Sequence, residues 1–307
     1  MMGTSSQTAA FESMRARLTG LAYRMLGSMA DAEDAVQDTY LRWQGADAAA
    51  IQNPEAWLTT VCTNRCLDLL KSAHKKRVDY VGSWIPEPLQ TTVSGDAENG
   101  LQLSQSLTTA FLLLMERLSP KERAAYLLHE IFGHPFSDVA DALDVSEAAA
   151  RQLSSRARQH VTMDRQRFLP PAETQDEFLS AFLDALTTGS TDHLAGLLAE
   201  TVRFRSDGGG KTTALRRILQ GSDQVNKYIS RILRRLWTEG EAVKMQVNGV
   251  AGLALIHDGK VVTAMVPGYA ADGTVEDVFM IRNPEKLRYL LEPLCHDPES
   301  GGLIRLC

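Results

Sequence analysis

The sequence has few cysteines and no long apolar run. Its 307 residues include four cysteines, and although 44% of the residues are hydrophobic, no stretch of them is long enough to cross a bilayer. The N-terminal residues MMGTSSQTAAFESMRARL also lack the apolar core of a signal peptide. These absences argue against a membrane-spanning or secreted chain. They predict a soluble, cytoplasmic protein of two or three small domains.

Metal and disulfide chemistry have little support. Cys62 and Cys66 lie one helical turn apart among leucines, which is typical of small core residues. The segment HEIFGH places His129 and His134 five residues apart, whereas the helical zinc-protease motif needs a spacing of four. We therefore expect no disulfide, no metal and no cofactor.

An excess of positive charge is also missing, since 38 acidic residues face 32 basic ones and the net charge is −6. That balance by itself argues against nucleic acid, but the distribution of charge matters more than its sum. The basic residues form two separate clusters, which are Lys71, Lys75, Lys76 and Arg77, and then Arg151, Arg156, Arg158, Arg165 and Arg167.

The segment DGGGKTT at 207–213 raises the question of a phosphate-binding loop. It follows a β-branched segment and leads into a helix-like one, TALRRIL. A Walker loop requires G-x-x-x-x-G-K-[ST], and here Arg205 stands at the position of the first glycine. A bulky cation cannot replace the glycine at which the backbone turns, and no series of βαβ units accompanies the motif. An ATPase is therefore disfavoured.

The first 80 residues predict helices. In ADAEDAVQDTYLRW, one face carries apolar side chains and the opposite face carries Asp31, Asp34 and Asp38. A second helix begins at Pro54, with Asn53 as its cap. Its predicted core face is Leu58, Val61, Cys62, Cys66 and Leu69, and its outer face is Thr60, Asn64 and Lys71.

Residues 119–161 fit a helix-turn-helix. Ser119 and Pro120 open a helix that Gly133 closes, SDVADALDV predicts a short helix, and Ser146 caps a longer one. The polar, arginine-flanked outer face of that last helix suits the major groove of DNA, because cations fix phosphates and Gln and Arg read base edges. An ordinary helical hairpin with a solvated basic face is the alternative.

The remaining segments predict a linker and a different class of domain. YVGSWIPEPLQTTVSGDAENG is rich in proline, glycine and small polar residues, which indicates an irregular or extended linker. After LPPAETQDEF, helical segments precede strand-like runs with hairpin turns at Asp258-Gly259 and Asp272-Gly273. Helices followed by an antiparallel sheet give an α+β domain, cone-like if the sheet curls.

Together, LAYRMLGSMADAEDAVQDTYLRW, NPEAWLTTVCTNRCLDLLKSA and the helix-turn-helix resemble extracytoplasmic-function sigma factors of bacterial RNA polymerase, a family of stress-response transcription factors. WIPEP, DGGGK and NPEKL resemble the signatures of a subgroup with a fused C-terminal SnoaL-like domain. The resemblance implies region two at 8–79, a linker at 80–100, region four at 101–168 and a SnoaL-like domain at 172–307.

The resemblance also implies partners and site residues: the polymerase core, promoter duplex and the melted non-template strand, with no obligatory separate anti-sigma factor. Core-binding residues would be Asp31, Asp34, Gln37 and Asp38. Minus-ten residues would be Thr60, Asn64, Arg65, Lys71, Lys75, Lys76 and Arg77. Minus-thirty-five residues would be Ser146, Glu147, Arg151, Gln152, Ser155, Arg156 and Arg158. Interdomain regulatory residues would be Trp84, Pro86, Asp207, Gly208, Gly209, Gly210, Lys211, Asn283 and Pro284.

Two other functions compete with a promoter-selecting sigma factor. SnoaL-like folds also host isomerases and cyclases, for which His257, Asp258 or Asp207 would be the acid or base, but no convincing carboxylate–histidine pair stands out. A one-component DNA-binding regulator with a ligand-binding C-terminal domain explains the helix-turn-helix but neither the first helices nor WIPEP. We expect a sigma factor without enzymatic activity.

Overall fold

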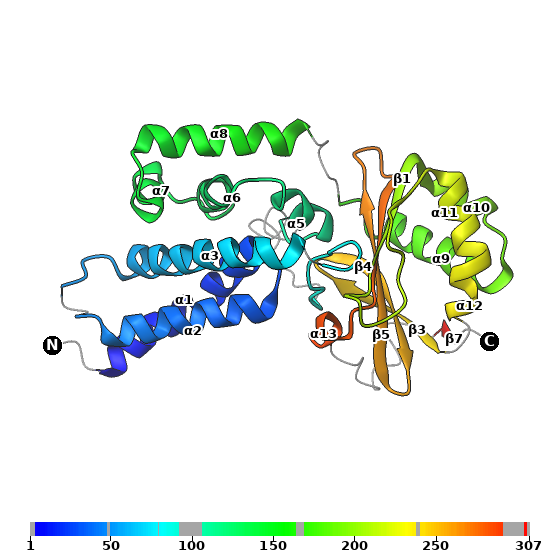
Figure 1. Cartoon of the computed structure of the whole chain (residues 1–307), viewed down its shortest axis with the longest axis horizontal. Coiled ribbons are helices and arrows are strands. Elements are labelled where there is room, and N and C mark those ends of the chain that lie inside the picture. The colour runs from blue at the N-terminus through cyan, green and yellow to red at the C-terminus, as the bar shows by residue number, and fades with distance from the viewer. Residues whose placement is uncertain are drawn as a thin grey trace. The chain divides into compact units, whose positions relative to one another are not determined.

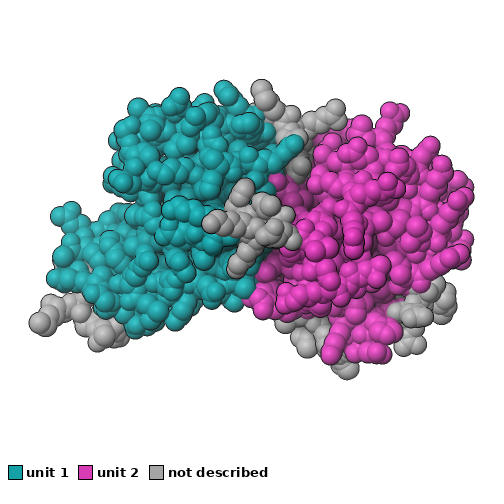
Figure 2. Space-filling view, viewed as in Figure 1, with its two compact units in different colours: residues 1–79, 114–164 teal, residues 80–113, 165–307 magenta. Residues whose placement is uncertain are grey.

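The computed structural model describes residues 4–47, 50–78, 80–91, 106–163, 169–237, 240–290 and 304–305. The chain forms two compact units, which Figure 2 colours separately. One comprises residues 1–79 and 114–164, and the other comprises residues 80–113 and 165–307. Within the described segments, no helix has both the length and the apolar character that crossing a membrane requires.

The first unit is entirely helical in its described part. It contains α1 (Thr4–Leu26), α2 (Met29–Gly45), α3 (Pro54–Val78), α6 (Pro120–Tyr126), the π-helical turn η1 (Leu127–Ile131), α7 (Phe136–Leu143) and α8 (Glu147–Met163). The short helix α5 (Thr109–Met115) crosses the boundary between the units. The order of these helices can be followed along the colour gradient of Figure 1.

The helix starts follow the sequence signals. Ser28 caps α2 by accepting a hydrogen bond from the backbone N–H of Asp31 at 3.2 Å. Ser119 and Glu122 form a capping box around the first turn of α6, with Pro120 at its first position. Ser146 accepts from the N–H of Ala149 at 3.2 Å, as expected for the cap of α8. The starts at Ser119 and Ser146 were predicted and are confirmed, as is the cap at Asn53, which accepts from the N–H of Ala56 at 3.2 Å; the cap at Ser28 was not predicted.

The buried face of α3 differs slightly from the prediction. Leu58, Cys62 and Cys66 are fully buried as expected. Val61 and Leu69 are only partly buried, however, and Leu67 and Leu70 take their place in the core. Leucines stand at positions 67, 69 and 70 of this helix, so periodicity alone left the centre of the buried face uncertain by about one residue.

The second unit is α+β. Helices α9 (Ala172–Thr188), α10 (Asp192–Leu197), α11 (Ser222–Tyr228), the π-helical turn η2 (Ile229–Leu233) and α12 (Arg234–Trp237) cover one face of a sheet (Figure 1). The sheet order is β2-β1-β6-β5-β4-β3-β7. The strands are β1 (Leu198–Asp207), β2 (Leu219–Gln220), β3 (Glu241–Val247), β4 (Val250–His257), β5 (Lys260–Tyr269), β6 (Val275–Ile281) and β7 (Ile304–Arg305), and the short helix α13 (Pro284–Leu287) follows β6.

Two expectations about this unit were wrong. The sheet is mixed, because β1 pairs with β6 in parallel, whereas an antiparallel sheet was predicted. The segment TALRRIL is not helical, since residues 213–218 are irregular and Leu219 and Gln220 form β2. Its β-branched and leucine residues suit an edge strand as well as a helix, and pairing with β1 decides between them. The hairpin turn at Asp258-Gly259 is confirmed, with φ of 50° and 72°.

The core of the second unit lies between its helices and its sheet. Side chains of β1 alternate, so that Phe204 faces the helices and packs on Tyr228 of α11 with ring centroids 5.0 Å apart. Phe182 of α9 contacts Trp237 of α12 at 6.0 Å. Asp207, which is odd-numbered on β1, consequently points to the opposite face of the sheet. That face carries the site described below.

Candidate nucleic-acid interface and linker clasp

The acidic residues of α2 share one face. Ala32, Ala35, Val36, Thr39 and Trp43 are buried against the neighbouring helices. Asp34 and Gln37 are exposed, and Asp31 and Asp38 are half-buried at the edge of the outer face. Leu41, which is 55% exposed, adds an apolar residue to this surface. The arrangement offers negative charge around an exposed leucine, which suits a basic protein partner.

Four of the predicted minus-ten residues lie in the described part of α3: Thr60, Asn64, Arg65 and Lys71. Asn64 and Lys71 are exposed, and both line a cavity of about 700 Å³ together with residues of α6, α7 and α8. Thr60 is half-buried. Arg65 forms an ion pair with Asp38 of α2, its Nε lying 2.5 Å from Oδ2. The side chains of Lys75, Lys76 and Arg77 lie outside the described residues.

All seven predicted minus-thirty-five residues lie at the exposed surface of α8 or its cap. Ala150 and Ala157 are fully buried beneath them, so the outer face of the helix is defined by packing. Arg151 pairs with Glu147 at 2.9 Å, and its guanidinium lies 5.1 Å from the centre of the Phe136 ring of α7. This face can present Arg151 together with Gln152 and Ser155 to a DNA groove. Arg165 and Arg167 of the second basic cluster lie outside the described residues.

Two of these arginines also bind other helices of the same unit. Arg156 pairs with Glu122 of α6 at 3.2 Å, and Arg158 forms an ion pair with Glu130 of η1. Hydrogen bonds from Ser119 hold the pKa of Glu122 below its usual value despite partial burial. The two arginines therefore hold α8 against the first helix of the helix-turn-helix, and they are already engaged without DNA.

In the second unit, three of the predicted regulatory residues, Asp207, Gly209 and Asn283, lie together at a buried carboxylate, that of Asp207. Asp207 is fully buried, and its carboxylate accepts four hydrogen bonds. The donors are the Tyr80 hydroxyl at 2.6 Å, the Ile85 N–H at 2.9 Å, the Lys286 ammonium at 2.8 Å and the Gly209 N–H at 3.1 Å. We call Tyr80, Ile85, Asp207, Asn283 and Lys286 the linker clasp, because two of them belong to the predicted linker.

Charge and aromatic rings complete the clasp. Lys286 is 6% exposed and also donates to the carbonyl oxygen of Ile85. Its ammonium lies 4.5 Å from the ring centre of Trp84 and 4.9 Å from that of Tyr80, so both rings add cation–π attraction. Asn283 donates to the Tyr80 hydroxyl at 3.0 Å. Burial, together with the neighbouring Asp207, raises the pKa of Tyr80 well above its usual value, so its hydroxyl remains a donor.

The predicted linker is thus part of the second unit. Leu89 exchanges hydrogen bonds with Asn248, receiving one at 2.8 Å and donating one at 2.6 Å, and Gln90 pairs with Val247 as an isolated β-bridge. Residues 80–91 have no helix, in line with the extended form that was predicted. They do not form a free tether, however, because they are bound at both ends to the sheet.

The DGGGK loop lies against the linker at Gly209 and Gly210, where an added Cβ would lie 3.1 Å from the Tyr80 hydroxyl and 3.4 Å from the Val81 side chain. A Cβ at Gly208 would lie 2.5 Å from the carbonyl oxygen of Thr212, and one at Gly209 would lie 2.3 Å from the Asn283 amide nitrogen. Gly209 also has a φ of 59°. Lys211 forms an ion pair with Glu285 of the same unit, and the contact with another domain that the resemblance implies stays a prediction. That ion pair keeps the pKa of Glu285 below its usual value.

The loop geometry does not fit a nucleotide site. Arg205, at the position of the first Walker glycine, lies in β1 with its Nε 3.4 Å from the carboxylate of Asp277. The lysine that would contact phosphate is engaged by Glu285, and an irregular segment rather than a helix follows the loop. These observations agree with the prediction that DGGGK is not a nucleotide-binding loop.

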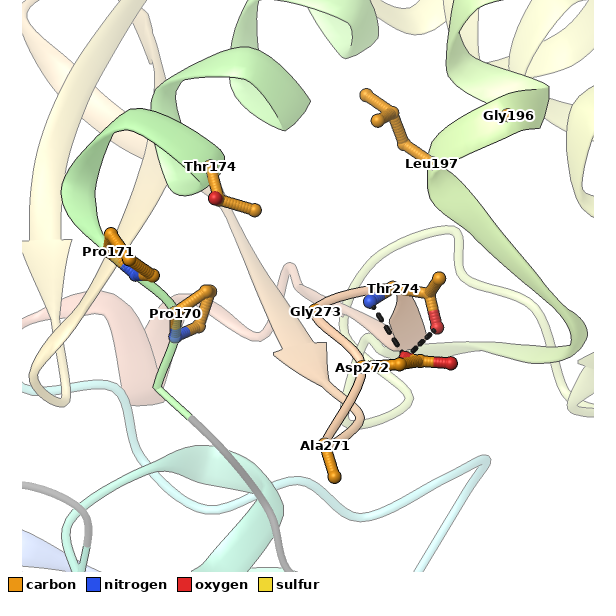
Figure 3. Close-up of a pocket in the computed structure, with 9 residues that line it drawn as sticks. All are labelled: Pro170, Pro171, Thr174, Gly196, Leu197, Ala271, Asp272, Gly273 and Thr274. Atoms are coloured by element: carbon orange, nitrogen blue, oxygen red, sulfur yellow. Dashed lines mark hydrogen bonds between the residues drawn. The ribbon is translucent and has the colours of Figure 1, made fainter.

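A separate cavity of about 330 Å³ lies where the β5–β6 hairpin approaches α9 and α10 (Figure 3). Asp272 is the titratable residue among its lining side chains, and its carboxylate accepts hydrogen bonds from the N–H and hydroxyl of Thr274 at 3.0 and 2.7 Å. Across the described residues, no group of three or more His, Cys, Asp or Glu is placed to hold a metal. This cavity does not contain an acid–base pair.

Sequence reasoning missed three members of the clasp: Tyr80, Ile85 and Lys286. Lys286 lay within the quoted NPEKL segment, and Ile85 lay within WIPEP. Tyr80 is the first residue of the predicted linker, four positions before WIPEP begins, and had no signal beyond its position. A buried lysine in a short motif could have been suspected only if a buried acid had been assigned as its partner.

The helical unit and the mixed α+β unit define a class of protein: a factor with two helical DNA-recognition regions and a fused α+β domain. Models of protein families agree, since residues 10–76 match Sigma-70 region 2 and residues 108–161 match Sigma-70 region 4. The chain belongs to the extracytoplasmic-function sigma factors of RNA polymerase, which direct the polymerase core to promoters for transcription initiation.

Two relatives show how far the similarity extends. The chain is 37% identical to the extracytoplasmic-function sigma factor SigJ of Mycobacterium tuberculosis over 91% of this chain and 93% of that one. The crystal structure of SigJ matches with a TM-score of 0.70, covering 91% of this chain and 97% of that chain. The chain is also 33% identical to the probable sigma factor SigI of the same organism, over 62% of this chain and 66% of that one. The C-terminal unit therefore shares the SnoaL-like fold of SigJ.

Proposed function

We propose that each helical face has a separate task in initiation. The acidic face of α2 docks on a basic surface of the polymerase core, the Asn64 face of α3 binds the melted non-template strand of the minus-ten element, and α8 reads the minus-thirty-five duplex. The exposure of each face supports this division, because each offers the chemistry that its partner needs. A protein that acts with the polymerase core is expected in the cytoplasm.

We further propose that the C-terminal unit modulates initiation by holding the segment that joins regions two and four. The observation that carries this proposal is the buried carboxylate of Asp207 with its four donors, two of which come from residues 80–85. A segment held in this way has a different reach and conformational freedom from a free tether. The clasp would give the chain a built-in regulator, and an obligatory separate anti-sigma factor is not expected.

An enzymatic role for the C-terminal unit has less support. His257 and Asp258 lie 3.4 Å apart, but they are 49% and 88% exposed on a hairpin turn. Asp207 is bound to Lys286 and three further donors, which leaves it poorly placed to take a proton from a substrate. The helix-facing side of the sheet is filled with Phe178, Phe182 and other apolar side chains. We therefore propose a non-catalytic, regulatory domain.

The test is promoter-specific run-off transcription with purified core polymerase and the full chain carrying Tyr80→Phe. This change removes the hydroxyl that donates to Asp207 but keeps the ring beside Lys286. Tyr228→Phe, in the same unit but outside the clasp, is the matched control. A change in transcript yield of at least about twofold, confined to Tyr80→Phe, is expected. Equal yields from wild type and Tyr80→Phe would contradict the proposed modulation.

A further inference from the structure

Charges of alternating sign run from α2 across the outer face of α3. Asp38 of α2 pairs with Arg65 of α3, and Lys71 pairs with Asp68 at 2.9 Å. Residues 65, 68 and 71 are spaced by three along the helix, so they are neighbours on its surface. The cations Lys71, Arg65 and Arg42 all stabilise the ionised form of Asp68, and its pKa lies below the usual value. An acid thus lies among cations on the face assigned to DNA.

That placement is unfavourable for a surface that binds nucleic acid, unless the acid has a task. Arg65 and Lys71 were assigned to the minus-ten strand, and Asp68 lines the same cavity as Asn64 and Lys71. A carboxylate there repels phosphates and occupies the ammonium group that would bind them. The Lys71 and Asp68 side chains are 74% and 57% exposed, so fold stability gains little from this pair. A role in packing therefore does not account for Asp68.

We propose that Asp68 is a positioning residue that competes with DNA phosphates for Arg65 and Lys71. In the chain without DNA, its carboxylate holds Lys71 directly and attracts Arg65, so that sequence-independent attraction to single strands is kept low. Contacts between the bases and Asn64 then make up a larger share of the binding free energy. This inference rests on the proposed assignment of α3 to the melted strand.

The effect of Asp68 is expected to be modest and uniform across sequences. An exposed ion pair of this kind shifts an equilibrium by up to about fivefold. Phosphate contacts carry no sequence information, so Asp68→Asn should strengthen binding to promoter and unrelated strands by the same factor. Each cation that becomes available to a single strand should also steepen the dependence of log affinity on log salt by up to about 0.7.

The experiment uses the full chain bound to core polymerase. Fluorescence anisotropy measures its affinity for fork DNA, a labelled duplex with a single-stranded non-template extension of promoter or unrelated sequence, over a series of salt concentrations. Glu55→Gln is the matched control, since it removes one negative charge from the first turn of the same helix, far from Lys71. We expect Asp68→Asn to tighten binding about threefold to both forks, and Glu55→Gln to leave it unchanged.

Simple repulsion of DNA by Asp68 would give the same gain, so a double-mutant cycle separates the two explanations. If Asp68 acts by holding cations, Asp68→Asn should lose most of its effect in a Lys71→Ala background. A gain that persists undiminished there, or no gain in the single variant, overturns the proposal. Asn64→Ala tests the underlying assignment. If it weakens binding to the promoter fork while Asp68→Asn has no effect, only the inference about Asp68 fails; if Asn64→Ala also has no effect, the α3 assignment fails with it.

Discussion

Replacing Lys286 with methionine should weaken the linker clasp. The substitution keeps a long, flexible side chain but removes the ammonium that lies 2.8 Å from the Asp207 carboxylate. Asp207 is fully buried and Lys286 is 6% exposed, so solvent cannot take the place of the lost partner. Breaking a buried ion pair by removing one member costs about 3–5 kcal/mol, because an uncompensated charge remains. The Tyr80, Ile85 and Gly209 donors stay with Asp207, so we expect the lower part of that range, about 3 kcal/mol.

Urea unfolding at pH 7, followed by tryptophan fluorescence, measures the effect, since Trp84 and Trp237 report on the second unit. Lys244→Met is the matched control: Lys244 pairs with Asp176 at 3.0 Å in the same unit, with the two side chains 31% and 60% exposed. Its loss should cost less than about 1 kcal/mol. The double variant Asp207→Asn, Lys286→Met should be more stable than the sum of its single changes predicts, because it leaves no buried charge.

A loss below about 1 kcal/mol for Lys286→Met, equal to that of Lys244→Met, would refute this reasoning. It would mean that the clasp is open in solution or that water reaches Asp207. Limited proteolysis offers a second readout, because a weakened clasp should open more often and expose the backbone of residues 80–91 to cleavage. Faster cleavage in this segment is expected for Lys286→Met and not for Lys244→Met.

Three further predictions follow from individual residues. Arg151→Ala or Gln152→Ala should each weaken binding of the polymerase-bound chain to minus-thirty-five duplex by about 1–3 kcal/mol, and unchanged binding in a gel-shift titration would contradict the assignment of α8. Gly209→Ala should destabilise the second unit by at least about 1 kcal/mol more than Gly259→Ala. Both glycines have positive φ, but a Cβ at Gly209 would clash with Asn283, while one at Gly259 would meet nothing within 4 Å. Equal unfolding midpoints of the two variants in urea would contradict this. Burial, aided by the positive charge of Arg17, lowers the pKa of His134, so the neutral imidazole stabilises the fold fully above the unfolded pKa of about 6.5, and this stabilisation is lost as the pH falls below that value. His134→Gln should therefore reduce the fall in melting temperature of the first unit between pH 7 and pH 5. An unchanged fall would contradict this.

Local signals in the sequence determined most of the helical unit. Ser28, Ser119 and Ser146 cap their helices through atoms within three residues, and such contacts require nothing from the rest of the chain. The exposed faces of α2 and α8 likewise follow from the spacing of apolar residues. The order of short motifs then identified the family, which similarity to SigJ over 91% of the chain confirms. The roles assigned to single residues on these faces remain predictions.

The tertiary structure decided what the sequence left open, because the interactions concerned join distant residues. Asp207 meets Tyr80 and Lys286 across 127 and 79 positions of the chain, and no local pattern marks which buried acid will receive which buried cation. The parallel pairing of β1 with β6 similarly depends on where the chain returns to the sheet. The sequence by itself therefore indicated the helices, the family and the presence of a contact at DGGGK. Only the folded chain showed that this contact is a buried carboxylate holding the linker, since burial and ion pairing are properties of the packed molecule and not of a motif.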